Sequence, residues 1–214
     1  MSTGAGPAGG LRERKKQETR IALSWAAIRL AVERGVNEVR VEDIAAAAGV
    51  SLRTFRNYFS TKAEAIAARH VDRAVLIAEE LRARPADEPL WTAISAAVLA
   101  RFALGADEKP EGRGRPGGAP DEQWIAGIRL MLGEPSLQGE LQKASARAQT
   151  ALAEAVAQRT GTDPRDVGPQ LVAAAVSAAL TVAVDQWVRA DPPAPLASHL
   201  RDVLDRLASG LPIP

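Results

Sequence analysis

The sequence predicts an all-α fold, and three observations carry that prediction. Hydrophobic residues make up 46% of the 214 residues, aromatic residues only 4%, and alanine is the commonest apolar type. Apolar residues recur at helical spacings along most of the chain. Long alternating runs of β-branched residues, which are typical of strands, are missing. A chain of this length forms one domain or two small ones.

The charge is unevenly distributed along the chain. Residues 1–62 contain 11 basic and 6 acidic residues, whereas residues 63–214 contain 16 basic and 20 acidic residues. This split is expected when one end of a protein meets a polyanion. There is no cysteine, which excludes disulfides and thiolate ligands. Since no run of 18 apolar residues and no apolar leader is present, we expect a cytoplasmic protein that neither spans a membrane nor is exported.

The first helix is expected to follow a short tail. Residues 1–10 are mostly small and are expected to be disordered, and five basic residues lie between Leu11 and Arg20. A helical apolar stripe with spacing i, i+4, i+7, i+11 then runs through Ile21, Trp25, Ile28 and Val32. Gly35 ends this helix. Its basic leading end either contacts DNA or serves only as a solubilising tail.

The run from Val41 to Phe59 is the most informative part of the chain. Val41, Ile44 and Ala48 share one face of a short helix, which Gly49 ends because glycine adopts the backbone angles of a sharp turn. Ser51 is placed to cap a second short helix. Two short helices joined by a turn containing glycine form a helix-turn-helix, whose second helix enters the DNA major groove.

The second helix has one apolar side and one polar side. Phe55 and Phe59, four residues apart, are expected to be buried. The candidates for DNA contact are the polar side of this helix and residues near the ends of the neighbouring helices. They are Arg40, Ser51, Leu52, Arg53, Thr54, Arg56, Asn57, Tyr58 and Lys62. Arg binds guanine, Asn binds adenine, and hydroxyls bind phosphate. The alternative is a helical hairpin that only packs and whose polar face is solvated.

A long helix is expected to connect the two parts of the chain. Thr61 and Glu64 have the spacing of a capping box, and Pro85 follows the last helical residue near Arg84. Lys62 in the first turn is suited to holding a phosphate.

The rest of the chain predicts further helices and one mobile loop. The loop is the Gly-, Pro- and charge-rich segment 105–120. The expected helices span about 91–104, 121–132, 137–160, 169–190 and 196–208. The helix at 169–190 is apolar nearly all round, so it must be covered on several sides. We therefore expect a homodimer through helices 169–190 and 196–208, which would form a four-helix bundle. The alternative is that this pair completes the core of one chain.

Large side chains among many alanines are the candidates for the wall of an effector pocket. They are Trp91, Ile94, Phe102, Trp124, Ile128, Met131 and Trp187. Each of them can equally be an ordinary core residue. No Gly-rich phosphate loop, paired metal-ligand spacing or nucleophile elbow is present, so we expect no enzyme, no cofactor and no metal.

Residues 12–66 resemble the TetR/AcrR family of bacterial transcriptional regulators. The resemblance is carried by the basic first helix and by the run VEDIAAAAGVSLRTFRNYFSTKAEAI. It implies about nine helices, a DNA-binding domain at 11–62 and an effector-binding and dimerisation domain at 63–214. It places Arg53, Thr54, Arg56 and Asn57 where the family reads bases or groove-facing backbone. It places Tyr58 and Lys62 at phosphate-binding positions.

The sequence departs from the family pattern at two positions. Arg40 stands where the family usually has a threonine cap, and Ser60 stands where proline is frequent. The segment from Ile128 onward is also similar to the C-terminal domain of the mycofactocin-system regulator, whose relatives are associated with acyl-coenzyme A effectors. Arg129 and Arg147 are the cations of this region that could meet such an anion.

Together these features predict a ligand-responsive repressor. It is expected to bind a palindromic DNA operator as a homodimer and to be released by a small apolar or acyl-type effector. The alternative is a helical small-molecule carrier or interaction module without DNA binding.

Overall fold

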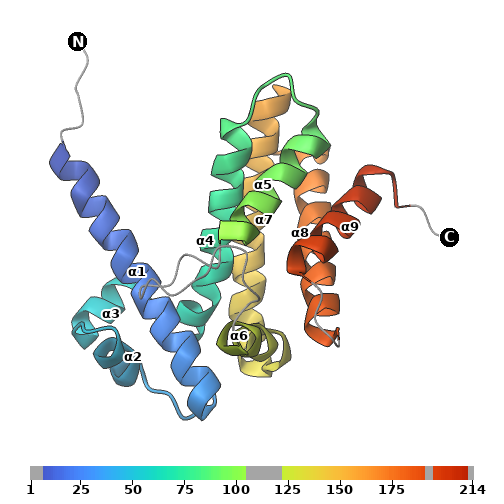
Figure 1. Cartoon of the computed structure of the whole chain (residues 1–214). Helices are drawn as coiled ribbons and strands as arrows, with labels where there is room; N and C mark the ends of the chain where they lie inside the picture. Colours follow the sequence, from blue (N-terminus) through green and yellow to red (C-terminus); the bar gives the residue numbers. More distant parts are fainter. Residues whose placement is uncertain (1–6, 105–121, 191–194, 212–214) are drawn as a thin grey trace.

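The computed structural model describes residues 7–104, 122–190 and 195–211. All regular structure in these ranges is helical, which confirms the predicted all-α class (Figure 1). The elements are α1 (Pro7–Arg34), α2 (Val41–Ala47), α3 (Leu52–Tyr58), α4 (Lys62–Ala83), α5 (Leu90–Leu104), α6 (Glu122–Gly133), the 3-10 helix η1 (Pro135–Leu137), α7 (Gln138–Thr160), α8 (Val167–Arg189) and α9 (Leu196–Ala208).

The start of α1 corrects one expectation. Residues 7–10 belong to this helix, although the whole segment 1–10 was expected to be disordered. Proline is favoured at the first helical position because its fixed φ suits the helix and its missing N–H is not needed there. Residues 1–6 and the loop predicted at 105–120 lie outside the described ranges.

The N-terminal core is built from α1, α2, α3 and the start of α4. Its largest fully buried side chains include Phe55, Phe59, Ile44 and Ile66. The ring centroids of Phe55 in α3 and of Phe59, the extended residue that follows α3, are 5.9 Å apart. Burying a side chain of this size stabilises the fold by about 1.5–3 kcal/mol.

The C-terminal core lies between α5, α7, α8, α9 and the second half of α4. Ile94, Trp187, Leu200 and Leu204 are fully buried in it. In Figure 1, α4 and α7 run side by side, and α9 crosses α8 at the edge of the domain.

Helix α4 belongs to both cores. Its Ala65 and Ile66 pack in the N-terminal core, and its Ile77 and Leu81 pack in the C-terminal core. The two cores also meet at Met131 of α6, which packs against both. Helix α4 is thus the long connecting helix that the sequence predicts.

Helix α8 has an exposed apolar side. By length and composition, it is the one helix in the described ranges that could cross a membrane. One side packs on α7 and α9, whereas Val167 is 81% exposed and Leu171 is 65% exposed. Val182, further along the helix, is 48% exposed.

Candidate functional site

The turn between α2 and α3 is held by backbone hydrogen bonds around one glycine. Gly49 has a φ of +69°, in the left-handed region that suits glycine. The N–H of Val50 donates to the carbonyl of Ala45 at 2.9 Å, which folds the chain back against α2. Ser51 then caps α3, since its Oγ accepts the N–H of Thr54 at 3.1 Å. The predicted turn and cap are both present.

Helix α3 is anchored by its phenylalanine and directs its polar residues outward. Phe55 is fully buried, whereas Arg53, Arg56 and Asn57 are exposed. Ser51 is also exposed, and Leu52, Thr54 and Tyr58 are half-buried at the edges of the exposed face. The Thr54 hydroxyl hydrogen-bonds to that of Ser51 at 2.9 Å, so this side chain is already part of the cap. The helix presents a polar ridge that is available to a partner.

Arg40 precedes α2 and its side chain is exposed. Its backbone N–H donates to Oδ2 of Asp43 at 3.0 Å. The Asp43 carboxylate thus satisfies the backbone N–H of the residue before α2, and its negative charge suits the positive end of the helix dipole.

The start of α4 combines two capping interactions with an internal role for Lys62. The Oγ1 of Thr61 accepts the N–H of Glu64 at 3.0 Å, and the Glu64 carboxylate accepts the N–H of Ser60 at 2.8 Å. The Nζ of Lys62 donates to the carbonyl of Val39 at 2.9 Å and to that of Asn37 at 3.3 Å. Lys62 therefore ties the loop before α2 to the start of α4, which sequence spacing did not predict.

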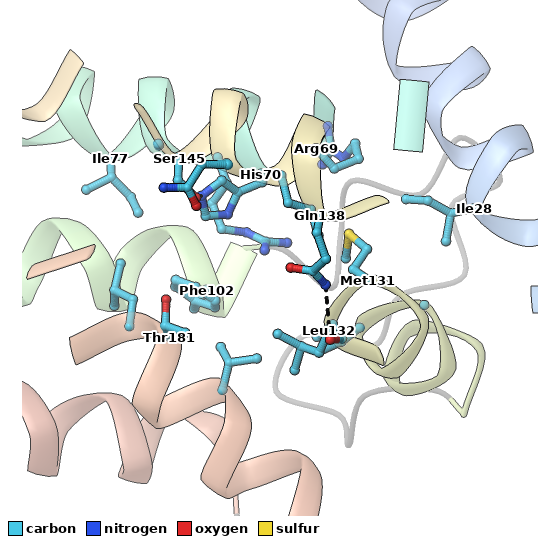
Figure 2. A pocket seen from close by; sticks show the side chains of 18 of the residues that line it. Ile28, Arg69, His70, Ile77, Phe102, Met131, Leu132, Gln138, Ser145 and Thr181 are labelled. Atoms are coloured by element: carbon cyan, nitrogen blue, oxygen red, sulfur yellow. Dashed lines mark hydrogen bonds between the residues drawn. The ribbon is translucent and has the colours of Figure 1, made fainter. Parts of the chain in front are cut away.

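A second feature is a cavity of about 360 Å³ between the N-terminal and C-terminal parts of the chain (Figure 2). Its polar wall comes from α4 and α7, with one residue from α8, and comprises Arg69, His70, Arg73, Gln138, Gln142, Ser145 and Thr181. Its apolar wall comprises mainly Trp25, Ile28, Ile77, Phe102, Ile128, Met131, Leu132, Leu141, Leu180 and Val184. This size lies at the lower end of the range for small-molecule sites.

Three of the pocket residues expected from sequence lie on this wall, namely Phe102, Ile128 and Met131. Ile94 and Trp187 are buried in the C-terminal core, and Trp91 packs against that core from the side. None of these three lines the cavity. The side chain of Trp124 lies outside the described part of the chain.

The basic residues of the cavity were missed by sequence reasoning. Arg69, His70 and Arg73 lie within about one turn of α4, and Arg73 stacks over the ring of Phe102 at 4.8 Å. The spacing i, i+1, i+4 of these three residues, which places them close together on one helix, was the sequence signal that could have indicated them. Arg129 and Arg147, the cations named from sequence, are exposed and do not line the cavity. Arg129 donates instead to the carbonyl of Val188 at 3.2 Å.

His70 faces the cavity beside Ser145, whose Oγ lies 3.5 Å from Nε2. Burial lowers the pKa of His70 below its ordinary 6.5, and the positive charge of Arg73 lowers this pKa further. Although the side chain reaches solvent, protein atoms surround it closely enough to disfavour the imidazolium. The lowered pKa favours the uncharged ring at neutral pH.

A partly buried ion pair joins α1 to the part of α4 that lines the cavity. Nε of Arg20 on α1 donates to Oδ1 of Asp72 on α4 at 3.1 Å. Asp72 is 8% exposed, and its other oxygen lies 3.7 Å from Arg69. Arg69 in turn lies over the Trp25 ring at 5.4 Å, and both residues line the cavity. The N-terminal core and the cavity wall are thus joined by a charged contact.

The described residues contain no group of three His, Cys, Asp or Glu side chains that could hold a metal ion. The arrangement of the helices and of the cavity defines the class of protein. The capped turn, the polar second helix and the separate cavity are those of a helix-turn-helix protein with an additional helical domain.

Comparison with known proteins identifies the family. Residues 25–68 match the family described as "Bacterial regulatory proteins, tetR family", and residues 88–212 match the "MftR C-terminal domain". The second match spans more than half of the chain. The chain therefore belongs to the TetR family and is a transcriptional regulator.

Two relatives are similar over most of their length. The HTH-type transcriptional regulator TcmR of Streptomyces glaucescens is 34% identical over 194 residues, which cover 89% of this chain and 81% of TcmR. The putative mycofactocin biosynthesis transcriptional regulator MftR of Mycobacterium tuberculosis is 28% identical over 202 residues, covering 92% and 93% of the two chains.

Solved structures share the fold at low identity. FadR of Thermus thermophilus, a transcriptional repressor solved in complex with lauroyl-CoA, has a TM-score of 0.56 and 19% identity over 91% of this chain and 96% of its own. The fatty acid degradation regulator FadR of Bacillus halodurans has a TM-score of 0.57 and 17% identity over 99% and 100%.

Proposed function

We propose that this regulator is a ligand-responsive repressor, cytoplasmic and without enzymatic activity, that binds a palindromic operator as a homodimer. The observation that carries the proposal is the exposed polar face of α3, which is held outward by buried Phe55 and by the Ser51 cap. A helix presented in this way fits the major groove.

The proposed DNA contacts fall into two groups. Arg53, Thr54, Arg56 and Asn57 are assigned to bases or the groove, with Leu52 in apolar contact at the edge. Phosphates are assigned to Arg40, Ser51, Tyr58 and Lys62. Lys62 has three N–H donors and uses two on carbonyls, so one donor can serve a phosphate.

The dimer is proposed to form through α8 and α9. The exposed apolar side of α8, including Val167, Leu171 and Val182, is the surface that such an interface would cover. Two copies related by a twofold axis would present two α3 helices to successive major grooves, about 34–36 Å apart. An effector that prefers another spacing would weaken DNA binding by about 1–3 kcal/mol.

The effector is proposed to be a small apolar or acyl-type molecule bound in the cavity. The largely apolar wall supports this class. The solved FadR with lauroyl-CoA shows what one protein of similar fold binds.

Selection from a pool of random DNA duplexes tests the proposal. A repressor of this kind should enrich a palindrome and should lose affinity steeply as salt rises, because several phosphate contacts release counterions. The triple variant Arg53→Ala, Arg56→Ala, Asn57→Ala should enrich nothing. The competing function is a small-molecule carrier, and a chain that shows no salt-dependent DNA binding would favour it.

A further inference from the structure

The first turns of α1 extend beyond the rest of the protein. In Figure 1 the helix runs past α2 and α3, and its leading turns lie apart from the other helices. The side chains of Arg12 and of residues 14–18 are exposed, whereas Leu23 is fully buried in the N-terminal core. At a rise of 1.5 Å per residue, Arg12 lies about 16 Å along the helix from Leu23. These exposed turns gain little from packing, so their surface is available to a partner.

Arg12, Lys16 and Arg20 form one row along α1. They are spaced four residues apart, and residues at i, i+4 and i+8 lie on successive turns of one side of a helix. The inner end of the row is held in place, because Nε of Arg20 donates to Oδ1 of Asp72 at 3.1 Å. The row therefore starts at the N-terminal core and runs outward along the exposed turns.

The inner end of this row lies beside the end of α3. The Arg20 guanidinium is 5.0 Å from the centroid of the Phe59 ring, and Phe59 directly follows α3. Tyr58, the last residue of α3, is one of the proposed phosphate contacts. Lys16 and Arg12 lie about 6 Å and 12 Å further along the axis of α1. The major groove is about 12 Å wide, so the phosphates that border a groove holding α3 lie at distances in the same range.

Another side of the same exposed turns carries an ion pair. Arg14 is two residues from Arg12, which places it about 160° away around the helix axis. Its Nε lies 3.5 Å from Oε1 of Glu18, and both side chains are exposed. Arg12 and Arg14 are thus two exposed arginines of the same turns that differ in the side of α1 they occupy.

We propose that Arg12 and Lys16 bind the DNA backbone beside the major groove that receives α3. A guanidinium fits phosphate oxygens with two parallel N–H donors, and a lysine supplies a further positive charge. Contacts to phosphates carry no base information, so they strengthen binding to every sequence alike and fix the position of the helix-turn-helix on the duplex. The inference rests on the proposed function, because it adds a contact to the proposed DNA-binding surface.

The salt dependence of DNA binding tests the proposal with the full chain and two probes, namely the selected palindrome and a random-sequence duplex. The logarithm of the affinity falls linearly with the logarithm of the salt concentration, and each phosphate contact contributes about 0.9 to the slope. Arg12→Gln should reduce the slope by about 0.9 for each bound copy of the chain. The reduction should be the same on both probes, because the lost contact is to a phosphate. Arg12→Lys should retain the slope, since it keeps the charge.

Arg14→Gln is the matched control, since it removes the same charge from the same exposed turns. It should change the slope by less than about half as much as Arg12→Gln does. Glutamine is a good helix former, so neither substitution should disturb α1. An unchanged slope in Arg12→Gln, or equal reductions by the two substitutions, would overturn the proposal. An unchanged slope together with a lower mass in solution would assign this side of α1 to a second copy of the chain instead.

The backbone contact and the proposed repressor function fail in different ways. A chain that enriches no palindrome, but whose salt slope on random DNA falls in Arg12→Gln, supports the contact and contradicts the repressor. A chain that enriches a palindrome but keeps its salt slope in Arg12→Gln does the reverse. A chain that binds neither probe contradicts both.

Discussion

Gly127 of α6 packs directly against Ile28 of α1, and a Cβ added at Gly127 would lie 2.8 Å from Cγ2 of Ile28. Both residues line the cavity, and Ile28 also belongs to the core that supports the helix-turn-helix. The cavity wall and the N-terminal core therefore touch at a point without spare room. A ligand that displaces α6 must also displace α1.

Gly127→Ala is expected to destabilise the fold by about 1–3 kcal/mol, because β-branched Ile28 is buried and cannot move aside easily. Urea unfolding measures the change. In an Ile28→Ala background the cost should become smaller, since the clashing methyl is gone. The control is Gly139→Ala in α7, where an added Cβ meets nothing within 4 Å. It should be neutral or stabilising, and an equal loss at both glycines would contradict the argument.

Asp72→Asn is expected to destabilise the chain by about 1.5–3 kcal/mol, because the buried carboxylate accepts from Arg20 and lies beside Arg69. Urea unfolding again gives the value. Asp202→Asn removes an exposed carboxylate that lies 2.9 Å from Arg206 on α9. Its cost should be at most about 0.5 kcal/mol. Similar costs for the two substitutions would show that the Arg20–Asp72 pair adds nothing beyond a surface pair.

His70→Gln should make the protein less sensitive to acid. The pKa of His70 is lowered in the folded state, so below pH 6.5 the unfolded chain binds a proton that the folded chain binds less readily. Folded-state stability therefore falls as pH drops through this window and is unaffected above it. The measurement is the difference in unfolding free energy between the two proteins at several pH values. If the unfolding free energy depends on pH equally in the two proteins, His70 does not contribute to the acid sensitivity.

Leu171→Glu should weaken the proposed dimer at least about tenfold, because it places a charge on the exposed apolar side of α8. Light scattering after gel filtration, at several protein concentrations, reports the change in mass. Val75→Glu on α4 is the control, since Val75 is also an exposed apolar residue but lies on another helix. A chain that is monomeric before the substitution rules out the dimer proposal.

Arg53→Ala should relax base preference at one operator position by about 1–3 kcal/mol, whereas Tyr58→Phe should weaken binding to all sequences alike. Affinities for the selected operator and for single-base variants separate the two effects. Lys62→Ala is less informative, because it also removes two hydrogen bonds to carbonyls of the preceding loop. If Arg53→Ala lowers affinity for operator and random DNA equally, Arg53 does not read a base.

The local signals predicted the fold well because they act over a few residues. Gly49 and Ser51 determine the turn and cap of α3, and Pro85 and Pro195 lie at helix boundaries close to those expected. The cavity was harder to predict. Periodicity indicates that Ile94 and Trp187 face inward, but it does not indicate whether they face another helix or a void. The carbonyl partners of Lys62 depend on the path of a loop more than twenty residues away.

Leu137 of η1 is fully buried in the N-terminal core. The rest of that core comes mainly from α1, α2 and α3, which end by Tyr58, and from α4, which begins at Lys62. During synthesis that core is incomplete until Leu137 has left the ribosome, well after α3 has emerged. An isolated fragment ending at Lys62 would lack this side chain as well as Ala65 and Ile66, and should not fold stably. The helix-turn-helix end of this protein is therefore expected to depend for its stability on side chains that lie after Lys62 in the chain.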